Sequence, residues 1–120
     1  MKGLHLTADL YRCRCEAAWL ADAAQLQQWC ASAVQAAGLE PVDRLFHALA
    51  GGGVSATLLM AGAHVCLHTW PDEKAANVDV YVSNAQGDQA AKARGLMLVL
   101  VNRFQPEWTE QRSLDRGEEE

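Results

Sequence analysis

Apolar and polar residues alternate in short segments of the chain, most clearly over residues 3–10 and 77–83. A period of two is typical of a β-strand that buries one face. Turn-forming residues, such as the glycines at 51–53, separate further segments of this kind. The predicted strands are residues 3–10, 42–49, 54–60, 64–70, 77–83 and 108–114.

One longer segment follows the helical period. It begins at Asp22, with Gln25 three residues later as in a capping box, and Gly38 is a suitable stop. Its apolar residues recur every three or four positions and make one stripe. The stripe consists of Leu26, Trp29, Cys30, Ala33, Val34 and Ala37.

A second helix is predicted from Asp88, as its capping residue, to about Phe104. The apolar run at residues 96–101 within it would also suit a strand. The length of the segment, the cap and the stop at Pro106 favour a helix.

The order of elements is strand, helix, four strands, helix, strand. Hairpin-linked strands with two amphipathic helices predict an α+β fold, a two-layer sandwich in which an antiparallel β-sheet carries both helices on one face. With 120 residues the chain is long enough for one domain. We assign that domain to residues 1–117 and treat residues 118–120 as an acidic tail.

The second face of this sheet is polar. It collects histidine, serine, threonine and acidic side chains from several strands. These residues are His5, Thr7, Asp9, Ser55, Thr57, His64, Cys66, His68, Asn77, Asp79, Tyr81 and Ser83. Such a face is solvated, covered by a partner, or part of a functional site, and the pattern alone leaves all three open.

Net charge and hydropathy bear on which partners the protein has and where it is located. A net charge of -5 argues against nucleic-acid binding. No apolar run approaches the roughly 20 residues of a membrane span, and residues 1–10 lack the apolar stretch of a signal peptide. We therefore expect a cytoplasmic protein without a membrane or nucleic-acid partner.

The four cysteines form no C-x-x-C pair, so free thiols are expected, with Cys30 and Cys66 buried. His64 and His68 are separated by four strand residues, about 13 Å, too far to bind one ion. No metal site is expected. Serine, histidine and aspartate occur without a nucleophile elbow, so no hydrolase triad is indicated.

Four motifs carry a more specific signal. The chain opens with Gly3-Leu4-His5-Leu6-Thr7-Ala8-Asp9-Leu10-Tyr11. Gly53-Val54-Ser55 is followed by Ala63-His64-Val65-Cys66-Leu67-His68-Thr69-Trp70-Pro71-Asp72, and then by Ala76-Asn77-Val78-Asp79-Val80-Tyr81. In content and spacing these motifs resemble the prokaryotic S-adenosylmethionine decarboxylases, as does the ending Asp115-Arg116-Gly117. The resemblance covers nearly the whole chain.

The resemblance implies a defined chemistry. Members of that family cut themselves at a Glu-Ser bond, where the serine hydroxyl attacks the preceding carbonyl. The resulting pyruvoyl group forms a Schiff base with the amine of S-adenosylmethionine and accepts electrons as carbon dioxide leaves. The product feeds spermidine synthesis.

Several positions match the family's functional residues. His68 stands at the position of its processing base and Ser55 at that of a processing serine. Asp72 replaces a glutamate that is expected to bind the ribose hydroxyls, and Trp70 and Leu4 lie at further ligand-binding positions. His68 and Trp70 are equally compatible with a purely structural role within the sheet.

The differences lie at the chemical centre. Gly62-Ala63 replaces Glu-Ser, and alanine has no hydroxyl, so no pyruvoyl cofactor is expected. Ser83 replaces the proton-donating cysteine, and an alcohol is a far weaker acid than a thiol. Leu49 replaces a phenylalanine that stacks on adenine. Three such losses indicate natural divergence rather than a single engineered change.

Three functional hypotheses follow. The first is an uncleaved pseudoenzyme of polyamine metabolism that binds S-adenosylmethionine or a related nucleoside, as a homodimer or as a heteromer with an active paralogue. The second is an enzyme that decarboxylates by a non-standard route or uses His68, Cys66 or Asp79 for another reaction. The third is a binding module for another ligand, or a structural partner.

Overall fold

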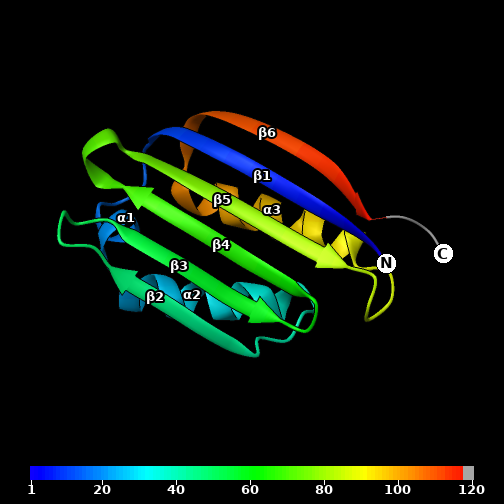
Figure 1. The fold of residues 1–120 in the computed structure, drawn as a ribbon. Coiled ribbons are helices and arrows are strands. Elements are labelled where there is room, and N and C mark those ends of the chain that lie inside the picture. The colour runs from blue at the N-terminus through cyan, green and yellow to red at the C-terminus, as the bar shows by residue number, and fades with distance from the viewer. Residues whose placement is uncertain (118–120) are drawn as a thin grey trace.

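The computed structural model describes residues 1–117, and the predicted acidic tail lies outside them. Six strands form one sheet in the order β2-β3-β4-β5-β1-β6, and every neighbouring pair is antiparallel (Figure 1). Its strands are β1 (Lys2–Cys13), β2 (Asp43–Ala48), β3 (Val54–Met60), β4 (Ala63–Trp70), β5 (Ala75–Ser83) and β6 (Pro106–Gly117). The helices are α1 (Ala18–Ala21), α2 (Ala23–Ala36) and α3 (Ala90–Phe104), with a 3-10 turn at Pro71–Glu73.

The helices cover one face of the sheet only. Helix α3 packs on β5 and β1, α2 lies beside it against β2, and the sheet's other face stands in front of both in Figure 1. The predicted α+β sandwich with an antiparallel sheet and its helices on one face is therefore confirmed. The core lies between these layers, where residues such as Leu10, Leu26 and Phe104 are fully buried.

The beginning of α2 follows the sequence signal. Asp22 is its N-cap, and the Asp22 Oδ1 atom accepts a hydrogen bond from the Gln25 N–H at 3.1 Å. For α3 the prediction was wrong by one residue, because Gln89 occupies the N-cap position. Asp88 lies just before it and accepts from the Ala90 N–H at 3.0 Å, so it still satisfies a free donor of the first turn.

Two elements and several bounds differ from the prediction. The short α1 and the 3-10 turn were not predicted, and β1 and β6 are longer than expected. A single turn of helix shows no repeated apolar period, so the pattern contains no signal for it. The predicted burial of Cys66 is wrong. All four cysteines are free, but Cys66 is only half-buried, because it lies on the face away from the helices.

Thr69 connects three elements below the sheet. It is 1% exposed and its hydroxyl donates to the Leu20 carbonyl at 2.7 Å, while it accepts from the Val54 N–H at 2.9 Å. Gly53 lies close by, and a Cβ atom there would come within 2.4 Å of the Thr69 carbonyl oxygen. The fold itself therefore requires two residues of the sequence motifs: Thr69 for its buried hydrogen bonds and Gly53 for its close approach to the Thr69 backbone.

No helix within residues 1–117 is long and apolar enough to cross a membrane.

Replacing Thr69 by valine keeps the shape of the side chain but leaves the Val54 N–H and the Leu20 carbonyl without their partner. We expect Thr69→Val to lower the free energy of unfolding by about 2–4 kcal/mol, since each buried unsatisfied group costs about 1–3 kcal/mol. Chemical denaturation measures the difference. Thr57→Val, on the uncovered face, is the control and should cost much less; equal losses would contradict this role for Thr69.

Candidate functional site

The polar residues predicted to share one face do so. The register pairs His68 of β4 with Ser55 of β3 and Asn77 of β5, and Asn77 in turn pairs with Asp9 of β1. We call the face that carries these residues the open face, because all three helices lie on the other side. Family-matching residues gather at its two opposite ends.

The first end contains Gly62 and Ser83, with Ala63 next to them in the chain. The Gly62 carbonyl oxygen accepts two hydrogen bonds from Ser83, one from its hydroxyl at 2.7 Å and one from its N–H at 3.1 Å. Two donors on one carbonyl oxygen polarise it, as in an oxyanion hole. Ser83 therefore binds the peptide between Gly62 and Ala63, the position at which the resemblance places the family's cleavage point.

Gly62 is itself fitted to this contact. Its φ angle of +66° lies in the left-handed region, which side chains other than glycine's rarely adopt. A Cβ atom at this position would lie 2.6 Å from the Ser83 Oγ atom. Gly62 and Ser83 are thus coupled to each other by this contact.

Ala63 begins β4 and does not join the open face. Its register partners are Met60 and Val82, and its methyl group packs against the apolar core. The position therefore offers neither a hydroxyl nor a polar environment.

The second end contains Ser55, His68, Trp70 and Asp72. The Ser55 hydroxyl and the His68 Nδ1 atom are 2.9 Å apart and form a hydrogen bond. Asp72 is exposed in the 3-10 turn that follows β4. The imidazole and carboxylate are both available to a ligand, and Ser55 orients the imidazole.

Trp70 is tied into a chain of polar contacts. It is 43% exposed, and its Nε1–H donates to the Asn77 Oδ1 atom at 2.7 Å. The Asn77 amide donates in turn to the Asp9 Oδ1 atom at 2.9 Å. Asn77 and Asp9 are functional candidates by geometry; the sequence placed both on the polar face and within the quoted motifs but assigned neither a role.

The two ends are far apart within one chain. Ala63 and His68 lie on the same strand five residues apart, which corresponds to about 16 Å. The structure therefore brings Ser55 together with His68, and Ser83 together with Gly62, but it does not bring these pairs together.

The two predicted leucines also separate. Leu49 is half-buried in the turn after β2, whereas Leu4 is 5% exposed and points to the helix side of β1. Leu4 and Ser83 line a cavity of about 300 Å³ beside the start of α3, with Arg94 and Asp115 on its wall. Leu4 can therefore contact a ligand from this cavity and not from the open face.

Two histidines occupy the middle of the open face. His5 and His64 meet edge to face, with ring centroids 6.3 Å apart, and both pack on Tyr81. The His5 Nε2 atom is buried, lies 3.7 Å from the Asp79 Oδ2 atom, and has no hydrogen-bond partner within residues 1–117. Burial, and next the neighbouring His5, hold the pKa of His64 below its ordinary value of 6.5, although Asp79 raises it.

The cysteines differ in chemical availability. Burial raises the pKa of the Cys30 thiol to about 12 and that of Cys13 to about 11, so neither provides a thiolate at neutral pH. Cys66 lies on the open face, where its sulfur is 3.4 Å from the Thr57 hydroxyl. It is the thiol among the four that a ligand on this face would meet.

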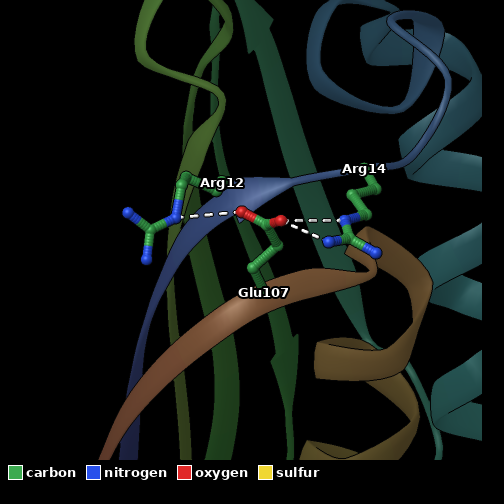
Figure 2. A network of polar contacts seen from close by, with 3 residues as sticks. All are labelled: Arg12, Arg14 and Glu107. Carbon is green, nitrogen blue, oxygen red and sulfur yellow. Dashed lines mark hydrogen bonds and ion pairs between the residues drawn. The ribbon is translucent and has the colours of Figure 1, made fainter.

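A charged cluster joins β1 to the start of β6 (Figure 2). Glu107 lies between Arg12, whose Nε is 3.0 Å from its Oε2 atom, and Arg14, which binds its Oε1 atom. The hydrogen bond and charge of Arg14, followed by those of Arg12, lower the pKa of Glu107. Both arginines are mostly exposed, at 69% and 71%, so solvent screens the cluster and its stabilising effect is small.

A double-mutant cycle tests the coupling of Gly62 and Ser83. Gly62→Ala should cost about 1–2 kcal/mol for the left-handed backbone and more for the collision with the Ser83 Oγ atom. In a Ser83→Ala background the collision is gone, so the same substitution should cost at least about 1 kcal/mol less. Strictly additive free energies of unfolding would contradict the coupling.

The depressed pKa of His64 predicts a pH dependence. Between the unfolded pKa near 6.5 and the lower folded value, the unfolded chain binds more protons, so stability must fall as the pH falls through this window. We expect His64→Gln to flatten the decrease in unfolding free energy between pH 7 and pH 5. His47→Gln, on exposed strand β2, is the control; an unchanged slope in His64→Gln would refute the assignment.

Comparison with known proteins agrees with the motifs. The family model described as "S-adenosylmethionine decarboxylase" matches residues 4–117. An S-adenosylmethionine decarboxylase proenzyme from Hydrogenobaculum sp. (strain Y04AAS1) is 31% identical over 116 residues, which are 96% of this chain and 81% of that protein. An arginine decarboxylase proenzyme from Hyperthermus butylicus is 33% identical over 104 residues, 85% of this chain and 72% of that protein.

A solved structure gives the same answer for the fold. The crystal structure of the adenosylmethionine decarboxylase from Aquifex aeolicus VF5 superposes with a TM-score of 0.86 at 29% sequence identity, covering 98% of this chain and 92% of that one. The family model and this structure therefore agree on nearly the whole chain. The chain belongs to the S-adenosylmethionine decarboxylase family.

Proposed function

We propose that this protein is an uncleaved member of the family that binds S-adenosylmethionine or a related nucleoside without decarboxylating it. The observation that carries the proposal is Ala63. A methyl group packed against the core cannot attack the Gly62 carbonyl, so the ester that precedes a pyruvoyl group cannot form. The polyamine pathway of its relatives is the context in which such binding would matter.

The second end of the open face supports ligand binding. Ser55 and His68 keep their hydrogen bond, Asp72 keeps a carboxylate at the expected ribose position, and Trp70 presents a half-exposed ring. A ribose diol binds a carboxylate through two hydrogen bonds, and an indole ring stacks on a purine. These groups are sufficient to recognise a nucleoside without any contribution from Ala63.

Ser83 suits the same proposal. Its hydroxyl is engaged with the Gly62 carbonyl oxygen, so it acts as a structural donor at this peptide. A serine hydroxyl is also a poor proton donor to a carbanion, compared with a thiol of pKa near 8.5. Both changes therefore remove steps of the reaction while preserving the local backbone.

The separation of the two ends supports a dimer. A second copy, packed with its open face against the first and related by a twofold axis, would bring the Ser83 end of one copy near the His68 end of the other. Such a face also carries exposed apolar side chains, Leu45, Leu59, Trp70, Trp108 and Leu114, which water does not favour. An active paralogue of the same fold could occupy the second position equally well, which would make the protein a regulatory subunit.

A second ligand class is favoured by one finding. A relative of similar identity is described as an arginine decarboxylase proenzyme, so the scaffold is not restricted to S-adenosylmethionine. The residues above favour a nucleoside, because arginine has no diol for Asp72 and no base for Trp70. A residual enzyme activity is the third candidate and is tested by release of labelled carbon dioxide.

The first test is calorimetric titration of the purified chain with S-adenosylmethionine, after intact mass has shown an uncleaved chain of 13.1 kDa. We expect saturable binding, which Asp72→Ala weakens about tenfold or more, because a hydrogen bond to a charged group contributes about 1.5–3 kcal/mol. Glu73→Ala, one residue away in the same 3-10 turn, is the matched control and should bind normally.

Other outcomes would overturn parts of the proposal. A mass that shows two fragments, or carbon dioxide release above background, would restore an enzymatic role. Binding of arginine but not of S-adenosylmethionine would change the ligand class. Absence of binding at millimolar concentrations of both would refute the binding role and leave protein partners to be tested.

A further inference from the structure

Strand β6 forms an edge of the sheet along its full length. In residues 1–117 it pairs with β1 on one side only, and its register runs without a bulge from the Lys2–Gly117 pair to the Tyr11–Trp108 pair. Edge strands in natural proteins are usually short, or are blocked by charged side chains, proline or a bulge. β6 is 12 residues long and has proline only at its first residue, Pro106, and its charged side chains include both signs, so a second strand with matching charges can still pair with it. Its free backbone groups are therefore open to another strand.

The side chains of β6 on the open face have a symmetric pattern. Trp108, Glu110, Arg112 and Leu114 lie on this face, because they pair with Tyr11, Asp9, Thr7 and His5 of β1. Gln111 is at the centre of the pattern. An acidic and a basic residue flank it at one position on either side, and exposed apolar residues follow at three positions, with Trp108 53% and Leu114 58% exposed.

We propose that β6 pairs antiparallel with β6 of a second copy of this chain, with the twofold axis at Gln111. Glu110 of each copy then lies opposite Arg112 of the other, and Trp108 opposite Leu114. Opposite charges and aromatic–aliphatic pairs are the favourable cross-strand combinations in a sheet. The result is one continuous sheet of twelve strands, twice the six of one chain.

The charges select this register. A twofold axis perpendicular to the sheet keeps the open faces of both copies on the same side when it passes through a residue position. The two registers nearest to the proposed one therefore have their axes at Glu110 and at Arg112. With the axis at Glu110, the two Glu110 carboxylates would lie opposite each other. With the axis at Arg112, the two guanidinium groups would do so. Like charges in direct opposition destabilise a strand pair.

One pair in the proposed register has like charges, and the chain compensates for it. Glu107 lies opposite Asp115 of the second copy. Glu107 is already bound by Arg12 and Arg14 of its own chain (Figure 2), so its negative charge is neutralised locally. The pair at this position is therefore not a barrier to association.

The edge contact is independent of the proposed ligand site. The side chains that would pair across the axis belong to the outer strand β6, whereas Ser55 and His68 lie on β3 and β4, with β5 and β1 between β4 and β6. Pairing along β6 therefore leaves the proposed ligand site free. The edge contact and the face-to-face contact together would produce a tetramer, and the edge contact remains testable if no nucleoside binds.

Cysteine cross-linking tests the register directly. Residues directly opposite each other have Cβ atoms about 4.5–5.5 Å apart, close enough for a disulfide after a small shift. Under mild oxidation, Gln111→Cys should form a covalent dimer by itself. Thr109→Cys and Ser113→Cys should each stay uncross-linked alone and should cross-link when mixed, because position 109 faces position 113.

Arg44→Cys on exposed edge strand β2 is the control for random collision, and the unaltered chain is the control for its own four thiols. Covalent dimer formed at least tenfold faster by Gln111→Cys than by Arg44→Cys is the expected result. Equal rates for the two, or self-cross-linking of Ser113→Cys at the rate of Gln111→Cys, would overturn the proposal.

Charge reversal provides a second, independent measurement. Glu110→Arg places two like-charged pairs across the axis, and so does Arg112→Glu, so each variant should associate about tenfold or more weakly than the unaltered chain in sedimentation experiments. A mixture of the two variants has only opposite charges across the axis and should recover association. Each variant also loses the ion pair between Glu110 and Arg112 within its own chain. Mixing cannot restore that ion pair, so any recovery of association comes from the contact between chains. Unchanged association of the single variants, or no recovery on mixing, would refute the paired edge.

Discussion

Coverage of the sheet on one side only is the constraint on which the rest of the structure depends. Helices α2 and α3 bury the apolar residues of β1, β4 and β5, and the period of two then obliges the alternate residues to face away from the helices. This second set contains His5, His68, Asn77 and Asp79, together with exposed leucines and tryptophans. All three helices of the described residues lie on the other side, so the polar residues of the motifs on this face remain uncovered by the chain itself.

Thr69 and Gly53 show that a motif can combine two roles. His68 and Trp70 point to the open face, whereas Thr69 between them points into the core and bonds β3 and α1. Gly53 is required where the turn before β3 approaches the backbone of Thr69. The persistence of His-Thr-Trp-Pro is therefore partly explained by folding alone. His68 bonds only Ser55 among the described residues, on the exposed side, and packing does not account for it as fully.

The fold was predictable from the sequence because its signals are local and mutually consistent. Alternation over residues 3–10 and 77–83, the cap at Asp22 and the stripe of α2 each identify an element, and hairpin connections leave few ways to arrange them. The site was less predictable. Alternation already puts Leu4 and Ala63 on the side opposite to His5 and His64. Nothing in the sequence shows that Leu4 and Ser83 line one cavity, or that Asn77 connects Trp70 to Asp9, because these contacts depend on the register between strands. The one-residue error at Asp88 has a local origin: Asp88 accepts from the Ala90 N–H although it precedes the N-cap, and the N-cap Gln89 makes no side-chain cap hydrogen bond.

Gly62 and Ser83 form a matched pair at one end of β4 and β5. With residue 62 in the left-handed region, a Cβ atom there would lie 2.6 Å from the Ser83 Oγ atom, so glycine at position 62 suits serine at position 83. Their hydrogen bond lies just beyond the Ala63–Val82 pair, at the end of the two strands away from their connecting turn, and it holds the peptide that precedes Ala63. Neither residue of this peptide has a nucleophilic side chain, because Gly62 has none and the Ala63 methyl group packs against the core. The polar and charged groups that a partner can reach lie elsewhere, on the open face around His68 and along the edge of β6.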